Sequence, residues 1–173
     1  MKPSASLLAE QGQQAFSAGK FTEAVHLFSE AAEAYQAVSD ACNAAEMHNN
    51  LSVALLKLGK AREALDAVAD TDKIFEQAGD MRRQGMALGN QAAALEALRK
   101  WDEALAAYEH SATLLTQAGE DELRAIVLQS MATLKLRRGK WMEAAFSMIG
   151  ALEATPHPNL LQRLLRFLLR LIS

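Results

Sequence analysis

Apolar residues recur along most of the chain at intervals of three and four, the spacing of one face of an α-helix. Before Gly59 they are Met47, Leu51, Ala54, Leu55 and Leu58. Gly59 predicts the end of that helix, because glycine takes the left-handed backbone conformation without a Cβ clash. Similar spacing predicts one further helix over residues 61–78. The pattern is therefore that of short turns joining packed helices.

The turn after the first helix recurs at a constant interval of 40 residues. It consists of a start position, a lysine, two variable residues and Glu-Ala, and it starts at Gly19, Gly59, Arg99 and Gly139. A fixed period of this size is typical of stacked-repeat proteins. We predict four units, over residues 5–40, 41–80, 81–120 and 121–156. Ser39 replaces the glycine that closes the later units, so we expect a less sharply ended helix there.

Two positions of the repeated turn have structural explanations. The alanine column Ala24, Ala64, Ala104 and Ala144 indicates close approach of the two helices of each unit. The glutamate before each alanine falls in the first turn of a helix, where a negative charge interacts favourably with the helix dipole. These glutamates lie one repeat apart, too far to act as a catalytic pair.

The repeat resembles the tetratricopeptide repeat family. A large residue follows the alanine by four positions and a small one by seven, as in that family's pattern (Phe28, Val68, Tyr108, Met148; Ala31, Thr71, Ser111, Ala151). The 40-residue period exceeds the usual ~34 and is similar to the longer repeats of kinesin light chains. The resemblance implies an all-α, right-handed superhelical solenoid whose first helices line a concave groove.

Residues 157–173 differ in character from the repeats. They predict an amphipathic helix that caps the solenoid, with Arg163, Arg166 and Arg170 on one stripe. The apolar arc is wider than a cap alone needs. The alternatives are contact with a membrane surface, or self-association through a row of apolar residues: Leu161, Leu165, Leu168 and Ile172.

Composition narrows the class of protein. Half of the residues are hydrophobic and three are prolines, which fits an all-helical chain. The net charge of −3 gives no reason to expect nucleic acid or a membrane as partner. A single cysteine, Cys42, and a start without the apolar core of a secretion signal favour the cytoplasm.

No residue pattern predicts catalysis. None of His26, His48, His110 and His157 lies three or four residues from another histidine, and none has a run of other ligand residues around it. Most of the glycines fall at helix ends, and none forms a phosphate-binding loop. We therefore predict no enzyme activity, no cofactor and no metal.

The resemblance implies a peptide-binding groove whose central column lies nine residues before each turn. Asparagine offers both a donor and an acceptor to a peptide backbone, although it also bonds neighbouring repeats. The predicted groove residues are Glu10, Gln13, Asn49, Asn50, Val53, Lys57, Asn90, Ala93, Gln129, Ser130, Thr133 and Arg137. The lysines of the carboxylate-clamp co-chaperones are missing, so that subclass is excluded.

We predict a non-enzymatic module that binds a peptide or helix of a partner protein. The alternative is a structural or small chaperone-type repeat protein that forms a homodimer through residues 157–173. Mass measurement on a chain lacking residues 159–173 would separate the two hypotheses.

Overall fold

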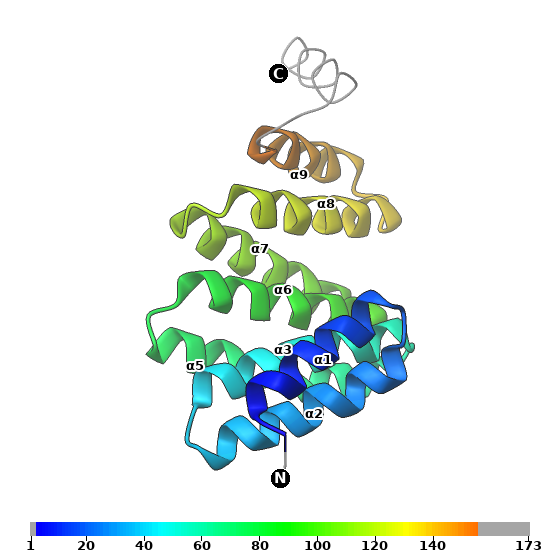
Figure 1. Ribbon diagram of the computed structural model, residues 1–173. Helices are drawn as coiled ribbons and strands as arrows, with labels where there is room; N and C mark the ends of the chain where they lie inside the picture. The colour runs from blue at the N-terminus through cyan, green and yellow to red at the C-terminus, as the bar shows by residue number, and fades with distance from the viewer. Residues whose placement is uncertain (1–2, 156–173) are drawn as a thin grey trace.

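The computed structural model describes residues 3–155, and over that range the chain is all helix (Figure 1). The helices follow one another through short turns. They are α1 (Ala5–Ser17), α2 (Phe21–Ala37), α3 (Ala41–Lys57), α4 (Ala61–Ala67), α5 (Thr71–Gln77), α6 (Met81–Ala97), α7 (Trp101–Gln117), α8 (Asp121–Arg137) and α9 (Trp141–Ala154).

Most helices that are neighbours in sequence also pack against each other. Extensive contacts join α1 to α2, α2 to α3, α6 to α7 and α8 to α9, and the pairs stack into one layered column (Figure 1). The predicted all-α architecture of stacked helical repeats is thus confirmed. The predicted cap, residues 157–173, lies outside the described residues, as do Leu161, Leu165, Leu168 and Ile172.

The alanine column holds each helix pair together. Ala24, Ala64 and Ala104 have no exposed surface and Ala144 is 2% exposed. In every unit the lysine before the second helix pairs with the glutamate three residues later, at N–O distances of 3.0–3.3 Å. These pairs are exposed and contribute little stability. The buried alanines therefore account for the geometry that the turn has in every unit.

The expectation of a weaker end at Ser39 is wrong. Ser39 has φ of 60°, in the left-handed region that Gly79 also occupies. The amide of Asp40 donates to Tyr35 O at 3.0 Å, just as the amide of Asp80 donates to Phe75 O at 2.9 Å. The hydrogen bonds of the turn therefore hold a serine in a conformation that glycine adopts more easily.

The single helix predicted over residues 61–78 is also wrong. The chain breaks between α4 and α5, where Asp70 has φ of 60°. The buried hydroxyl of Thr71 donates to Val68 O at 2.9 Å and so satisfies a carbonyl beside the break. Asp70, Thr71 and Asp72 are poor helix-interior residues, which favours a break here. Asp70 makes no side-chain capping hydrogen bond, but Asp72 places a negative charge in the first turn of α5.

Two larger apolar cores lie on either side of this break. One, centred on Phe28, joins α1, α2 and α3. The other, with Tyr108 and Leu115, joins α6 to α9. Smaller clusters around Phe75 and Ala64 connect them. The broken second unit therefore links two better-packed halves.

Close approach of α6 and α7 shapes the C-terminal half. The hydroxyl of Ser111 donates to Gly85 O at 2.6 Å. A Cβ built on Gly85 would lie 2.9 Å from a side-chain atom of Leu115, so only glycine fits there without a shift. One turn later, Gly89 leaves open the surface described next.

Candidate functional site: a groove over α6 and α8

The C-terminal half contains a cavity of about 220 Å³ between α6, α7 and α8. Three predicted groove residues, Asn90, Ala93 and Ser130, line it. Its other walls are largely apolar and comprise Met86, Gly89, Tyr108, Leu115, Leu123, Ile126 and Val127. Met86 is 37% exposed and Ile126 is 60% exposed, so apolar surface continues out of the cavity. Such a hollow suits an apolar side chain of a partner.

A polar network lies beside this cavity. The phenol of Tyr108 donates to Glu96 Oε2 at 3.2 Å, and Arg137 donates to Glu96 Oε1 at 2.9 Å. Burial raises the pKa of Tyr108, and the neighbouring Glu96 carboxylate adds to the effect. Tyr108 therefore stays a neutral donor. The side chain of Glu96 is 16% exposed and that of Arg137 is 64% exposed, so the network links the cavity to the surface.

The N-terminal half has a smaller cavity of about 90 Å³ in the corresponding place. The predicted residues Gln13, Asn50 and Val53 line it together with Phe16 and Phe28. Phe28 occupies the column of Tyr108, and a Cβ on Gly12 would come within 2.7 Å of its ring. The phenylalanine ring therefore fills much of the space that remains open in the other half.

The asparagines differ in what they bond. Asn49 is 6% exposed and donates to Ala45 O at 3.0 Å. Asn90 donates to Asn49 Oδ1 at 3.2 Å, which ties α6 to α3. Asn50 is half-buried at the small cavity. One amide donor of Asn90 therefore serves the stack, while Asn50 keeps its amide at the groove surface.

The remaining predicted residues line neither cavity. They are all exposed: Glu10, Lys57, Gln129, Thr133 and Arg137. Glu10 accepts a hydrogen bond from Gln14, and Thr133 donates to Gln129 O. Sequence reasoning missed Tyr108, Leu123 and Ile126 as cavity residues. The aromatic at the large position of the third unit was the available signal for Tyr108.

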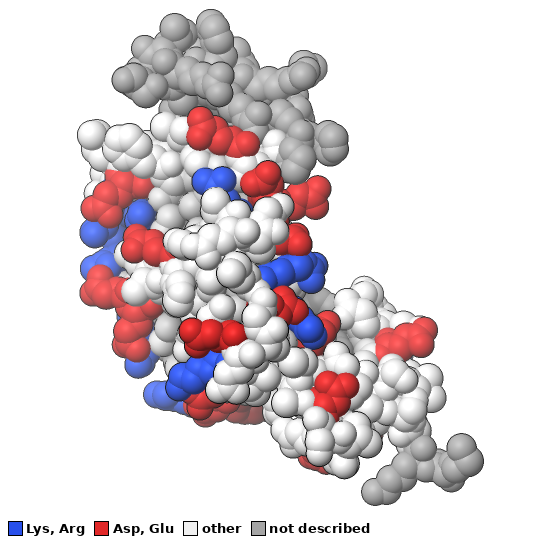
Figure 2. Space-filling view, turned by 90° about the vertical axis from the view of Figure 1, so that its left-hand side faces the viewer, with Lys and Arg blue, Asp and Glu red and all other residues white. Residues whose placement is uncertain are grey.

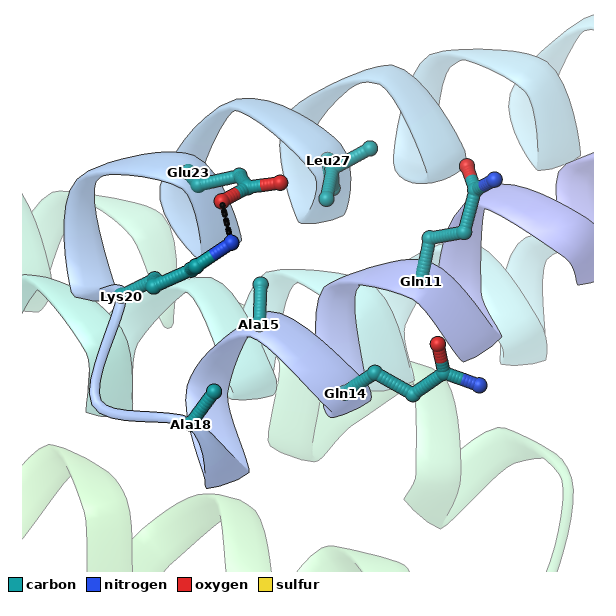
Figure 3. A pocket seen from close by; sticks show the side chains of 7 residues that line it. All are labelled: Gln11, Gln14, Ala15, Ala18, Lys20, Glu23 and Leu27. Atoms are coloured by element: carbon teal, nitrogen blue, oxygen red, sulfur yellow. Dashed lines mark ion pairs between the residues drawn. The ribbon is translucent and has the colours of Figure 1, made fainter.

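Another pocket lies between α1 and α2 on a different part of the first unit (Figure 3). Its lining residues are Gln11, Gln14, Ala15, Ala18, Lys20, Glu23 and Leu27. The one ion pair there, Lys20–Glu23 at 3.2 Å, recurs in every unit as part of the turn. This pocket therefore gathers no chemistry specific to one unit.

Charges of both signs alternate along much of the face in Figure 2. Within residues 3–155, no helix is both long and apolar enough to cross a membrane. The same residues contain no group of three or more histidine, cysteine or acidic side chains placed to hold a metal.

The stacked helical pairs agree with a family-model match over residues 4–163, to "SNAP: Soluble NSF attachment protein, SNAP". The chain belongs to this family. The match covers all nine described helices. It supports a tetratricopeptide-like helical repeat, and the search of curated proteins found no match.

A solved structure with a similar fold is BtubC (BKLC) from P. vanneervenii, with a TM-score of 0.76 and 14% sequence identity. The similarity covers 90% of this chain but 66% of that one, so the chain spans about two thirds of its length. At this identity the likeness establishes the fold alone.

Proposed function

We propose that the protein is a non-enzymatic interaction module that binds a peptide or helix of a partner protein in its groove. Membership of the soluble NSF attachment protein family supports a role as an adaptor for protein interaction. The observation that carries the proposal is the apolar cavity over α6 and α8, lined by Asn90, Ala93 and Ser130.

The cavity defines the kind of segment that would bind. Its volume of about 220 Å³ accommodates a large apolar side chain as the anchor. Exposed Met86 and Ile126 would contact apolar neighbours of that anchor. Asn50 and Lys57 would contact the rest of the segment further along the groove, where Lys57 favours an acidic residue.

The finer assignments also belong to this proposal. The constant 40-residue interval supports repeats of the kinesin light chain type, with units over residues 5–40, 41–80, 81–120 and 121–156. The likeness to BtubC (BKLC) is consistent with this assignment at the level of fold. We also propose that the protein is cytoplasmic and uses no cofactor.

Site-specific photo-crosslinking in the native host tests the groove. A photoreactive residue replacing Ala93 should capture a partner, while the same residue at exposed Ala106 on α7 should not. Mass spectrometry of the Ala93 adduct should place the crosslink on one apolar side chain of a short segment. Identical adducts from both positions would remove the groove from the account.

A further inference from the structure

A further hollow, larger than the three cavities described above, lies at the N-terminal end of the stack, outside the groove. It has a volume of about 790 Å³ and opens between the start of α1 and the end of α2. Its lining residues are Pro3, Ser4, Ala5, Leu8, Glu30, Glu33, Ala34, Ala37 and Val38. Most of this lining is apolar, and Val38 is 70% exposed. An apolar surface of this kind calls for a covering element.

Two carboxylates give the hollow its charge. Glu30 and Glu33 are exposed, and neither forms an ion pair or side-chain hydrogen bond with any residue of the described chain. They are three residues apart on α2 and therefore lie on one helix face. Residues 3–40 contain one lysine, Lys20, and no arginine, against five acidic residues. On the face in Figure 2, the part beside the lower grey residues shows acidic side chains only.

The sequence of residues 159–173 has the opposite character. It contains three arginines and no acidic residue, and most of its other residues are apolar. Arg163 and Arg166 are three apart, the spacing of Glu30 and Glu33. Because the two pairs have the same spacing, both arginine–carboxylate contacts could form at once, while leucines enter the hollow.

The position of α9 indicates whether residues 159–173 would bind the hollow of their own chain or that of a second molecule. It lies at the opposite end of the column from α1, so residues that follow α9 start far from the hollow of their own chain (Figure 1). Residues 159–173 of another molecule can approach the hollow from any direction, because they are not tied to this chain's α9. A second copy is therefore the occupant that the arrangement favours.

We propose that the hollow between the start of α1 and the end of α2 binds residues 159–173 of a second copy of this chain, with Glu30 and Glu33 pairing with Arg163 and Arg166. The contact joins different surfaces of the two molecules, so it is head-to-tail and each dimer keeps one free hollow and one free segment. This self-association is independent of peptide binding in the groove.

Sedimentation of the full chain over ~10 μM to ~1 mM tests the contact. The average mass should rise with concentration, and E30K/E33K should raise the dissociation constant by about tenfold or more, because it places like charges together. The matched control D66K/E76K changes the same charge at exposed positions of α4 and α5 and should leave association unchanged. The combined variant E30K/E33K/R163E/R166E should restore association.

A mixing experiment tests the head-to-tail geometry. E30K/E33K has a free segment but a blocked hollow, and R163A/R166A/R170A has the reverse. Each alone should be monomeric, and their mixture should stop at a 1:1 dimer. A wild-type chain that stays monomeric to ~1 mM would overturn the proposal. Association that survives E30K/E33K would also overturn the proposal and would point to a contact through α9. Binding of residues 159–173 to their own chain would overturn it as well.

Discussion

The second helices of the units follow one sequence pattern but adopt two structures. In the first and third units, α2 and α7 run unbroken for 17 residues each. In the second unit, α4 and α5 have seven residues each, separated at Val68–Asp70. The same period therefore allows different backbones. The turns before and after α4–α5 match those of the other units. The local preference of Asp70, Thr71 and Asp72 therefore decides between the two backbones.

The break has a consequence for packing. The column of Phe28 and Tyr108 contains the smaller Val68 in the second unit, and all three are buried. Large aromatics anchor a core in each half, while the clusters between them are small. The two groove cavities lie in these two halves, on either side of the broken helix. The second unit thus separates two halves that present different surfaces.

The largest expected effect comes from the core column. Phe28→Ala should lower the free energy of unfolding by about 3–5 kcal/mol, because Phe28 is 1% exposed and leaves a large void. Val68→Ala should cost less, roughly 1–2 kcal/mol, since only two methyl groups are lost. Urea denaturation measures both. Equal losses would show that the broken unit is packed as firmly as the first.

The capping residues at the starts of α3 and α6 should contribute about equally to stability, although α3 follows an unbroken second helix and α6 follows the broken one. Asp40 accepts from the Asn43 amide at 3.1 Å, and Asp80 accepts from the Arg83 amide at 2.9 Å. Replacing either with alanine should cost about 1 kcal/mol at pH 7. A much smaller loss for D80A would mean that the break also disturbs the following junction.

The Asp80 contribution should depend on pH. The backbone amide of Arg83, followed by its guanidinium, holds the pKa of Asp80 below its usual value. Because the folded-state pKa is lowered, the stabilisation is complete above the unfolded value of about 3.9 and is lost as pH falls through the folded value. The difference between wild type and D80N in unfolding free energy should therefore shrink below pH ~4. A constant difference down to pH ~2 would contradict this account.

Replacement by glycine at one column of the repeat should change stability in opposite directions in the broken and unbroken helices. Asp70 has φ of 60°, so Asp70→Gly should stabilise by roughly 0.5 kcal/mol through relief of backbone strain. His110 lies at the same column inside unbroken α7, where His110→Gly should cost roughly 0.5 kcal/mol. Thermal denaturation of the two variants gives the comparison. A loss of stability in both would argue for a continuous second helix.

The smallest effect is expected at Ser52. Its hydroxyl is fully buried and has no hydrogen-bond partner within residues 3–155. Ser52→Ala removes an unsatisfied polar group at little change in volume, so it should be neutral or slightly stabilising. A loss above about 1 kcal/mol would indicate a buried water at this position.

The sequence predicts the architecture well where a residue's role depends on its repeat position. The alanine column, the turns and most helix ends follow from the period, because each unit repeats the same packing problem. The period alone predicts a continuous helix across Asp70, whereas the local sequence Asp-Thr-Asp favours a helix start and overrides the period. Ser39 was misjudged because hydrogen bonds within the turn outweigh the cost of its positive φ.

The groove was harder to predict than the fold. Repeat alignment correctly places Asn90, Ala93 and Ser130 at one cavity. It contains no information on the burial of Asn49, which is 6% exposed. Tyr108 and Ile126 reach that cavity because Gly89 and Ala93 leave room, a matter of volumes across helices. The residues at one repeat position do not reveal how side-chain volumes on neighbouring helices combine.

The affinity of the photo-crosslinked partner segment for two tryptophan variants tests the groove most directly. Ala93→Trp fills the cavity over α6 and α8, whereas Ala106→Trp adds the same side chain at an exposed position that lines neither groove cavity. With both variants folded by circular dichroism, A93W should weaken binding at least about tenfold, a loss of ~1.4 kcal/mol, and A106W should change it little. Equal affinity of A93W and wild type would contradict binding in the groove.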